Sequence, residues 1–231
     1  MKPAEVVQID TARGYAAWAS GYDAQDNPII AAVERYLDRH RLPFPGARVL
    51  DVGCGTGRTM ARALTEGAAS VTGIDASQEM LALARKRLAA LAREGRVTLL
   101  NADLARPWPK LASDFDLAVI TLVLEHSAQM APIVHQVAAH LAKGALLFVA
   151  EIHPDMLKSG LGGHFQRDGI AYALPSHPHD ESEFVSSLAA AGFDVPVFYT
   201  IHADAATIAA IPKFAKHAGA GVMLTVRAVR S

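Results

Sequence analysis

Residues 48–58 read Arg48-Val49-Leu50-Asp51-Val52-Gly53-Cys54-Gly55-Thr56-Gly57-Arg58, and this stretch decides the fold. Residues 49–52 have the composition of a buried strand, alternate glycines follow at once, and residues 59–66 have the composition of a helix. A strand that turns sharply into a helix forms a binding corner for anions and nucleotides, because the helix N-terminus presents unpaired N–H groups and the positive end of its dipole. Glycine permits both the tight turn and the close approach of a ligand.

The side chains around these glycines differ from those of a dinucleotide-binding loop. A Gly-x-Gly-x-x-Gly loop would need a glycine where Arg58 stands. Asp51 precedes the first glycine by two positions, and a carboxylate there opposes a pyrophosphate and suits a cationic ligand. These residues disfavour a nicotinamide oxidoreductase. Taken alone, the turn is also compatible with a plain connection between a strand and a helix.

Strand and helix patterns alternate after the glycine turn, which predicts a parallel, doubly wound α/β sheet with right-handed crossovers. Ligands of such sheets bind at the carboxyl ends of the strands. A closing pair of strands often includes one antiparallel strand, so we expect a mostly parallel, seven-stranded sheet. The further strands are expected at residues 71–75, 97–101, 117–121, 145–151, 195–201 and 222–229, and the helices at 78–93, 132–141 and 180–191.

Two other segments are predicted to lie beside this sheet. Residues 1–45 are expected to form an N-terminal helical lid, with a first helix at 11–20 that Gly21 ends and a second at 28–40. The aromatic side chains of the first helix share one face, and they either pack the segment onto the domain or cover a ligand. Residues 46–231 form the main domain, whose glycine- and proline-rich stretch at about 152–178 is expected to be an insertion across the substrate edge.

Composition excludes several functional classes. The chain has 231 residues and 51% hydrophobic content, which suits one sizeable α/β domain. A net charge of −1 provides no global attraction to nucleic acid, and the apolar runs are too short to cross a bilayer. The single cysteine, Cys54, excludes an internal disulfide and a multi-cysteine zinc site, and the histidine spacing forms no recognisable metal cluster. The first residues lack the apolar core of a secretory signal, so a cytoplasmic location is expected.

Acidic residues stand at the ends of three successive predicted strands: Asp51, Asp75 and Asp103. The carboxyl ends of parallel strands share one edge of a sheet, so these side chains are expected to lie together. A carboxylate at the position of Asp75 can accept both hydrogen bonds of a ribose diol, although it can also serve as a helix N-terminal acid.

These motifs together resemble class I S-adenosylmethionine-dependent methyltransferases. Residues 116–126 resemble the fourth strand of that family and the segment after it. The Tyr15-x-x-Trp18-x-x-x-Tyr22-Asp23 and Glu151-Ile152-His153-Pro154 stretches resemble a subgroup that acts on small molecules, including natural products. The resemblance implies S-adenosyl-L-methionine as cofactor, with Asp103 accepting from the adenine amino group. The residues that it assigns to the cofactor are Tyr15, Tyr22, Asp51, Gly53, Cys54, Gly55, Gly57, Asp75, Ala76, Met80, Ala102, Asp103, Leu104, Thr121 and Leu122.

Missing motifs narrow the acceptor to a small molecule. No Asn/Asp-Pro-Pro-Tyr/Phe sequence follows the predicted fourth strand, which disfavours methylation of a nucleobase amine. The densest basic cluster, around residues 85–96, lies on a predicted surface helix, where a solvated face is expected. We therefore expect a small-molecule substrate, with neither nucleic acid nor membrane as a partner; no pattern specifies an oligomeric state.

Two histidines and two tyrosines are the candidates for acceptor chemistry. His126 follows the predicted fourth strand and His153 the fifth, and histidine has a pKa suited to a general base. Either histidine could instead cap a helix or satisfy a loop carbonyl. Tyr22 and Tyr172, like Tyr15, could line the pocket, supply a phenol or attract a sulfonium to their rings.

Three functions remain open at this point. We predict a methyltransferase that acts on a small molecule. A relative of the azetidine-2-carboxylate synthases would instead cyclise S-adenosylmethionine itself and release 5′-methylthioadenosine. A non-catalytic S-adenosylmethionine-binding protein is the third possibility, and the acids at Asp51, Asp75 and Asp103 argue against it.

Overall fold

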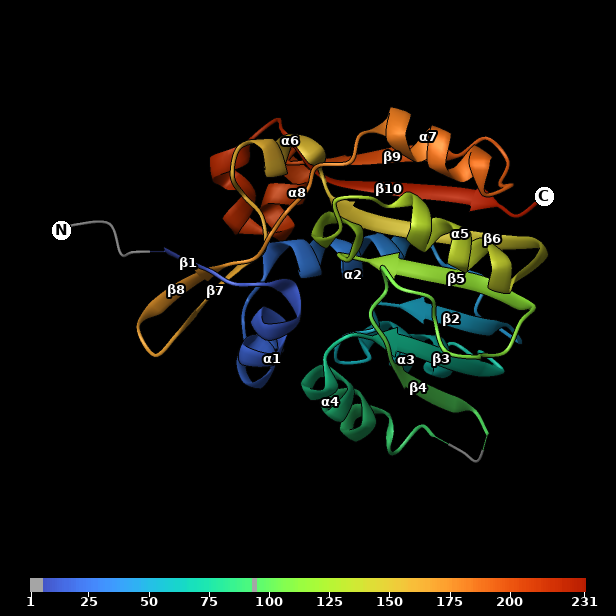
Figure 1. The fold of residues 1–231 in the computed structure, drawn as a ribbon. Helices are drawn as coiled ribbons and strands as arrows, with labels where there is room; N and C mark the ends of the chain where they lie inside the picture. The colour runs from blue at the N-terminus through green and yellow to red at the C-terminus, as the bar shows by residue number, and fades with distance from the viewer. Residues whose placement is uncertain (1–5, 93–94) are drawn as a thin grey trace.

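A seven-stranded sheet forms the centre of the computed structural model, which describes residues 6–92 and 95–231 (Figure 1). Its strand order is β4-β3-β2-β5-β6-β10-β9. The pairings from β4 through β6 are parallel, whereas β10 runs antiparallel to both of its neighbours. The predicted α/β, doubly wound, mostly parallel sheet is therefore confirmed. The strands are β2 (Arg48–Val52), β3 (Ser70–Asp75), β4 (Val97–Asn101), β5 (Phe115–Thr121), β6 (Leu141–Ile152), β9 (Val197–His202) and β10 (Gly221–Val229).

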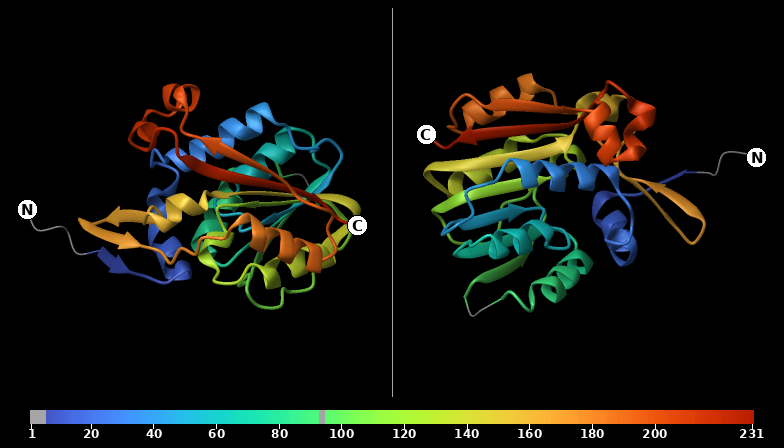
Figure 2. Two further views of the ribbon diagram at one scale, coloured as in Figure 1. Left: turned by 90° about the horizontal axis from the view of Figure 1, so that it is seen from above. Right: turned by 180° about the vertical axis from the view of Figure 1, so that it is seen from behind.

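Helices cover both faces of this sheet, as Figure 2 shows. Side chains alternate between the two faces of a strand. In β2, Val49 packs in the core under the first helical layer, whereas Leu50 and Val52 pack in the core under the second. Both faces of the strand are thus buried, which explains why its sequence is apolar apart from Arg48 at its start and the buried Asp51. The first layer contains α2 (Pro28–Arg39), α3 (Arg58–Thr65) and α4 (Gln78–Leu88), and the second contains α5 (Ala131–His140) and α7 (Glu181–Ala190).

Polar side chains begin the helices where the sequence indicates. The Asn27 side chain accepts hydrogen bonds from the backbone N–H groups of Ile29 and Ile30, and Ser77 accepts from that of Met80. Helix α4 ends at Leu88, earlier than the predicted residue 93. The end of that prediction falls on residues 93–94, which lie outside the described residues.

Helix α1 (Thr11–Tyr22) continues through Gly21, so the prediction that this glycine ends the helix was wrong. Glycine costs a helix only about 1 kcal/mol relative to alanine. The rings of Tyr15, Trp18 and Tyr22 pack against one another over the same turns, and their packing offsets this cost. The helix ends instead at its C-cap, Asp23.

A second, three-stranded sheet lies beside the carboxyl edge of the main sheet (Figure 1). Its order is β1-β8-β7, and the predicted connection at 152–178 supplies two of its strands as well as α6 (Pro154–Lys158). Helix α1 packs on this sheet through the stacked rings of Trp18 and Phe165, which are 5.1 Å apart. Helix α2 packs in the main core, whereas α1 packs with the small sheet. The strands are β1 (Val6–Gln8), β7 (His164–Arg167) and β8 (Ile170–Ala173).

Short helical segments complete the same edge of the molecule. The 3₁₀ turn η1 (Leu124–His126) follows β5, while α8 (Ala205–Ala210) and η2 (Pro212–His217) connect β9 to β10. Among the residues that the structure describes, we find no helix with the length and apolar character needed to span a bilayer.

Candidate active site

Two neighbouring cavities open at the carboxyl ends of the parallel strands. The first has a volume of about 590 Å³ and is lined from the glycine turn, the ends of β3 and β4, and the turn after β5. The second has a volume of about 760 Å³ and lies between α1, the small sheet and η2. Tyr15, Tyr22 and Leu122 line both cavities, so these side chains form the boundary between them.

The glycine turn has a backbone that other residues do not readily adopt. Gly53, Gly55 and Gly57 have positive φ angles of 74°, 51° and 78°. A Cβ atom on Gly53 would lie 2.3 Å from a methyl group of Val123, so no side chain fits between β2 and the turn after β5. Gly53 and Gly55 line the first cavity. Gly57 is the N-cap of α3 and faces Ala84, so its role is packing.

Asp75 links the glycine turn to α4. One of its carboxylate oxygens accepts from the backbone N–H of Gly55 at 2.8 Å, and the other accepts from that of Ser77 at 2.8 Å. Burial raises the pKa of Asp75, and these two N–H groups oppose that shift because they stabilise the charged form. The carboxylate also lines the first cavity. The residue therefore orders the turn and faces the ligand space at once.

The other two strand-end acids differ in exposure. Asp51 is only 1% exposed, and neither of its carboxyl oxygens has a hydrogen-bond partner among the described residues. Burial, and then the nearby charge of Asp75, raise the pKa of Asp51 to about 7. Asp103 lies at the rim of the first cavity, where it forms an exposed ion pair with Arg106 at 3.3 Å.

Most of the residues assigned to the cofactor meet at the first cavity. Cys54 lies outside it and is buried, and burial raises the pKa of its thiol. Asp51, Gly57 and Ala102 are also absent from the lining. The assigned residues that line the first cavity are Tyr15, Tyr22, Gly53, Gly55, Asp75, Ala76, Met80, Asp103, Leu104, Thr121 and Leu122.

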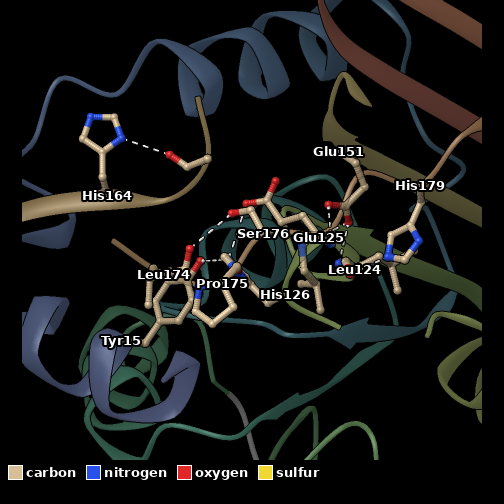
Figure 3. A network of polar contacts seen from close by, with 12 residues as sticks. Tyr15, Leu124, Glu125, His126, Glu151, His164, Leu174, Pro175, Ser176 and His179 are labelled. Atoms are coloured by element: carbon tan, nitrogen blue, oxygen red, sulfur yellow. Dashed lines mark hydrogen bonds and ion pairs between the residues drawn. The ribbon is translucent and has the colours of Figure 1, made fainter. Parts of the chain in front are cut away.

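His126 connects the lid helix to the turn after β5 (Figure 3). Its Nδ1 lies 2.8 Å from the carbonyl oxygen of Pro175, which only accepts, so this nitrogen carries the proton. Burial lowers the pKa of His126 and favours the neutral ring. Its Nε2 then accepts from the hydroxyl of Tyr15 at 2.9 Å. Both ring nitrogens are occupied, so His126 holds Tyr15 in place rather than facing a ligand with a free nitrogen.

A buried pair of glutamates lies behind this histidine (Figure 3). Glu151, at the end of β6, accepts from the backbone N–H groups of Val123 and Leu124 at 3.0 Å and from that of Glu125 at 3.5 Å. Burial raises the pKa of Glu151 to about 7, although these donors favour its charged form. Burial and the charge of Glu151 raise the pKa of Glu125 well above its ordinary value. Because only Glu151 has such donors, it holds the charge and Glu125 holds the proton.

Leu122 has a strained backbone at the boundary between the cavities. Its φ angle is 58°, in the left-handed region that non-glycine residues rarely adopt. A hydrogen bond from its N–H to the carbonyl of Ala150, at 2.9 Å, and the Glu151 contacts after it hold this turn. The strain places the Leu122 side chain against both cavities.

A polar cluster around Asp23 fastens the end of α1 to the glycine turn. The Asp23 carboxylate lies 3.0 Å from Nε of Arg58 and 2.6 Å from Nη2 of Arg87. It also accepts from the hydroxyl of Thr56 at 3.0 Å. The preceding residue, Tyr22, lines both cavities, and burial raises its pKa to about 12. The phenol is therefore protonated at neutral pH.

Two of the catalytic candidates lie outside both cavities. His153 is the N-cap of α6, where its Nδ1 accepts from the backbone N–H of Asp155 at 3.3 Å. Tyr172 stacks on Phe165 in the small sheet, with the ring centroids 5.0 Å apart. Neither side chain lines a cavity. The capping role for His153 is the alternative that the sequence left open.

The two glutamates were missed from sequence. Each follows an apolar strand-like run, at the same edge as the three aspartates, and that placement was the available signal. No group of His, Cys, Asp and Glu side chains in residues 6–92 and 95–231 is arranged to hold a metal ion.

Comparison with known proteins identifies the family. A family model described as a methyltransferase domain matches residues 49–144. A ubiquinone biosynthesis O-methyltransferase of Xylella fastidiosa is 31% identical over 181 residues, which cover 74% of this chain and 70% of that protein. An O-methyltransferase of Pyrenophora dematioidea is 34% identical over 138 residues, which cover 57% of this chain and 51% of that protein. The chain thus spans about half the length of the second relative.

Solved structures agree with these sequence matches. An S-adenosylmethionine-dependent methyltransferase from Mesorhizobium loti matches with a TM-score of 0.70 at 25% identity, over 87% of this chain and 100% of that chain. A structure from Listeria monocytogenes described as a putative enzyme of the same kind matches in fold, with a TM-score of 0.72 at 19% identity, over 89% of this chain and 100% of that chain. Since the glycine turn, the strand-end acids, the fold and the curated relatives all agree, the chain belongs to the class I S-adenosylmethionine-dependent methyltransferase family.

Proposed function

We propose that this protein transfers the methyl group of S-adenosylmethionine to a small-molecule acceptor. The observation that carries the proposal is the pair of cavities that share Tyr15, Tyr22 and Leu122. Methyl transfer needs the donor and the acceptor atom about 3–3.5 Å apart, with water kept out. Two spaces that meet at one aromatic boundary provide this arrangement.

The residues around the first cavity fit S-adenosylmethionine. Asp75 and Asp103 line it, where they suit the ribose hydroxyls and the adenine amino group. The orphaned carboxyl oxygens of Asp51, buried beneath the glycine turn, favour positive charge nearby. Tyr15 and Tyr22 present aromatic rings that attract a cation. When bound, the cofactor supplies an activated methyl group on a sulfonium.

The side chains at the boundary between the cavities position the reactants. Burial raises the pKa of the Tyr15 phenol well above its ordinary value, so the phenol keeps its proton and donates a hydrogen bond to Nε2 of His126. Leu122 fills the same boundary with an apolar side chain that helps to exclude water. These contacts support a role for Tyr15, Tyr22 and His126 in orientation.

The covering segment and the biological setting are part of the same proposal. Helix α1 and the small sheet serve as a lid whose aromatic face closes both cavities. The apolar walls and limited volume of the second cavity favour a metabolite over nucleic acid or a membrane surface. We also propose a role in natural-product biosynthesis, and a cytoplasmic setting, in which an unpaired, buried cysteine such as Cys54 is usual.

An incubation with isotope-labelled S-adenosylmethionine tests this function. The purified protein is mixed with cofactor that carries a labelled methyl group, with and without the small-molecule fraction of a bacterial extract, and the products are separated by mass spectrometry. We expect S-adenosylhomocysteine and a labelled small molecule only when the extract is present. Protein-dependent 5′-methylthioadenosine from the cofactor alone would contradict methyl transfer and support intramolecular cyclisation. Asp75→Ala provides the control with a damaged cofactor site.

A further inference from the structure

The second cavity has mostly apolar walls. Phe165 comes from the small sheet, Phe214 from η2, and Ile152 from the end of β6. These side chains line the cavity together with the boundary residues Tyr15 and Tyr22. A small organic molecule can bury its carbon skeleton here, and the polar groups in the lining then decide which molecules bind.

Two buried polar groups in this lining have no partner among the described residues. The indole Nε1 of Trp18 is a donor without an acceptor, and Oε2 of Glu125 has no hydrogen-bond partner. The two side chains are 6% and 3% exposed, and both line the second cavity. Buried polar groups are normally satisfied, so an orphaned donor and an orphaned acceptor beside one cavity indicate a ligand that completes both.

Positive charge gathers where η2 borders the same cavity. Lys213, Lys216 and His217 contribute to the lining from this turn. Lys213 is neutralised by Asp26, whose carboxylate oxygen lies 3.0 Å from its Nζ. Lys216 forms no ion pair within the part of the chain that the structure describes. Among the described residues, the lining therefore has one exposed lysine without an ion pair next to an imidazole, together with a buried indole donor.

Building on the methyltransferase function, we propose that the second cavity binds a small organic anion that also carries a hydroxyl or an amine N–H. The hydroxyl or amine donates to Glu125, at the end of the cavity nearest the strands. The anionic group, a carboxylate or a phosphate-like group, is bound by Lys216, His217 and the indole N–H of Trp18. The apolar middle of the molecule lies between the aromatic side chains.

The state of Glu125 is compatible with this role. Burial and the charge of Glu151 raise the pKa of its carboxyl, so the group can hold a proton while the site is empty. Its Oε1 lies 3.4 Å from Nε2 of His126, whose lone pair is occupied by Tyr15. With the proton of the neutral acid on Oε1, Oε2 is the carbonyl-type acceptor that a ligand donor reaches, and an ionised Glu125 accepts through the same atom. This places the hydroxyl or amine of the methyl-accepting molecule beside Tyr15, at the boundary with the cofactor cavity.

Matched probe compounds test the two ends of the cavity separately. The protein is first saturated with S-adenosylhomocysteine, and calorimetry measures the binding of this cofactor product. It is then titrated with 4-hydroxybenzoate, 4-hydroxybenzamide and 4-methoxybenzoate, and with the corresponding aliphatic set of 3-hydroxypropanoate, 3-hydroxypropanamide and 3-methoxypropanoate. Within each set, the amide removes only the charge and the methyl ether removes only the donor. Ligand-observed NMR reads the affinities without any turnover.

In at least one set we expect the hydroxy acid to bind about tenfold more tightly than its amide and its ether. Lys216→Met should remove the preference for the acid over the amide, and Glu125→Gln should reduce the preference for the hydroxyl over the ether. Trp18→Phe keeps an aromatic ring but removes the indole N–H, so it should weaken the binding of the carboxylic acids and leave that of the amides unchanged. Lys143→Met, at an exposed position near the start of β6, is the matched control and should change neither preference.

The outcomes separate this proposal from the function on which it rests. Equal or tighter binding of both amides, unchanged preferences in the variants, or no binding of either set up to about 10 mM would overturn the anionic acceptor while leaving the methyltransferase function intact. Tighter binding of the amides would identify a neutral acceptor. Failure of S-adenosylhomocysteine to bind in the first step would instead contradict the proposed function itself.

Discussion

The hydroxyl of Tyr15 lies 2.9 Å from Nε2 of His126, although the two residues are 111 positions apart in the chain. This contact connects the lid helix α1 to the turn that follows β5. Both side chains line the first cavity, and Tyr15 also lines the second. The hydrogen bond therefore fixes the boundary at which the donor and the acceptor of the proposed reaction would meet.

Tyr15→Phe should loosen this boundary while keeping the aromatic ring. Loss of a partly buried hydrogen bond should lower the free energy of unfolding by about 1 kcal/mol and speed hydrogen exchange in residues 11–22. Urea unfolding and exchange mass spectrometry measure the two effects. Tyr199→Phe is the control, because the Tyr199 ring is 54% exposed and lies on β9. Exchange in α1 that is the same in both variants would show that the contact does not hold the lid.

Asp23→Asn should free the end of α1 from the glycine turn. The variant weakens the contacts with Arg58 and Arg87, which are about one third exposed, so the loss of stability should be no more than roughly 1 kcal/mol. The larger effect should appear with ligand. S-adenosylhomocysteine should protect residues 11–26 from hydrogen exchange in the wild type and protect them less in the variant.

Asp38→Asn is the matched control for this experiment, because it breaks an arginine ion pair on α2, away from the lid. Two results would indicate that α1 packs on the domain without closing over the cofactor. In the first, the ligand does not protect residues 11–26 of the wild type. In the second, it protects them equally in the wild type and in Asp23→Asn.

Asp75→Ala should weaken the binding of S-adenosylhomocysteine by roughly 1–3 kcal/mol, because buried ribose hydroxyls would lose their acceptor. The same change removes the bonds to the N–H groups of Gly55 and Ser77, so part of the loss reflects disorder in the turn. Calorimetry measures the affinity, and urea unfolding reports the change in stability. Asp116→Ala, on the exposed side of β5, should bind like the wild type. Equal affinity in Asp75→Ala and the wild type would remove Asp75 from the site.

Asp51 should make the ligand-free protein less stable as the pH rises. Its pKa is about 7 when folded and 3.8 in the reference state, so between these values the folded chain binds more protons than the unfolded chain. The contribution of the protonated carboxyl to stability is complete below about pH 4 and is lost as the pH rises through 7. Asp51→Asn cannot ionise and should escape this loss.

The stability difference between Asp51→Asn and the wild type should therefore grow by about 2–3 kcal/mol from pH 5 to pH 8, the remainder being lost already below pH 5. Urea unfolding across that range measures the difference. Glu125 and Glu151 titrate similarly in both proteins and cancel. A difference that is constant with pH would show that Asp51 is already ionised in the folded chain at pH 5.

The central sheet was predictable because each of its strands is locally recognisable. Residues 117–120 of β5 form a continuous apolar run, β2 is apolar apart from Arg48 and Asp51, and the helix caps Asn27 and Ser77 stand at the starts of their helices. Parallel strands buried on both faces require such runs. The location of the cofactor site followed from the glycine turn and from acids at successive strand ends.

The small sheet was not predictable from local sequence. Its strands have three or four residues, β1 is exposed throughout, and β1 pairs with β8 more than 160 positions away. Pairing over such a separation leaves no local pattern. The roles of His126 and Glu125 depend on contacts with Tyr15, Pro175 and Glu151, which only the folded chain brings together.

The most direct test of this account is a crystal structure of the protein with S-adenosylhomocysteine. We expect the ribose at Asp75, the adenine at Asp103 and the thioether sulfur at the boundary formed by Tyr15, Tyr22 and Leu122, with the sulfur facing the second cavity. A sulfur that points away from the second cavity, or a ligand seated outside the first cavity, would contradict the proposal that the two cavities bring donor and acceptor together.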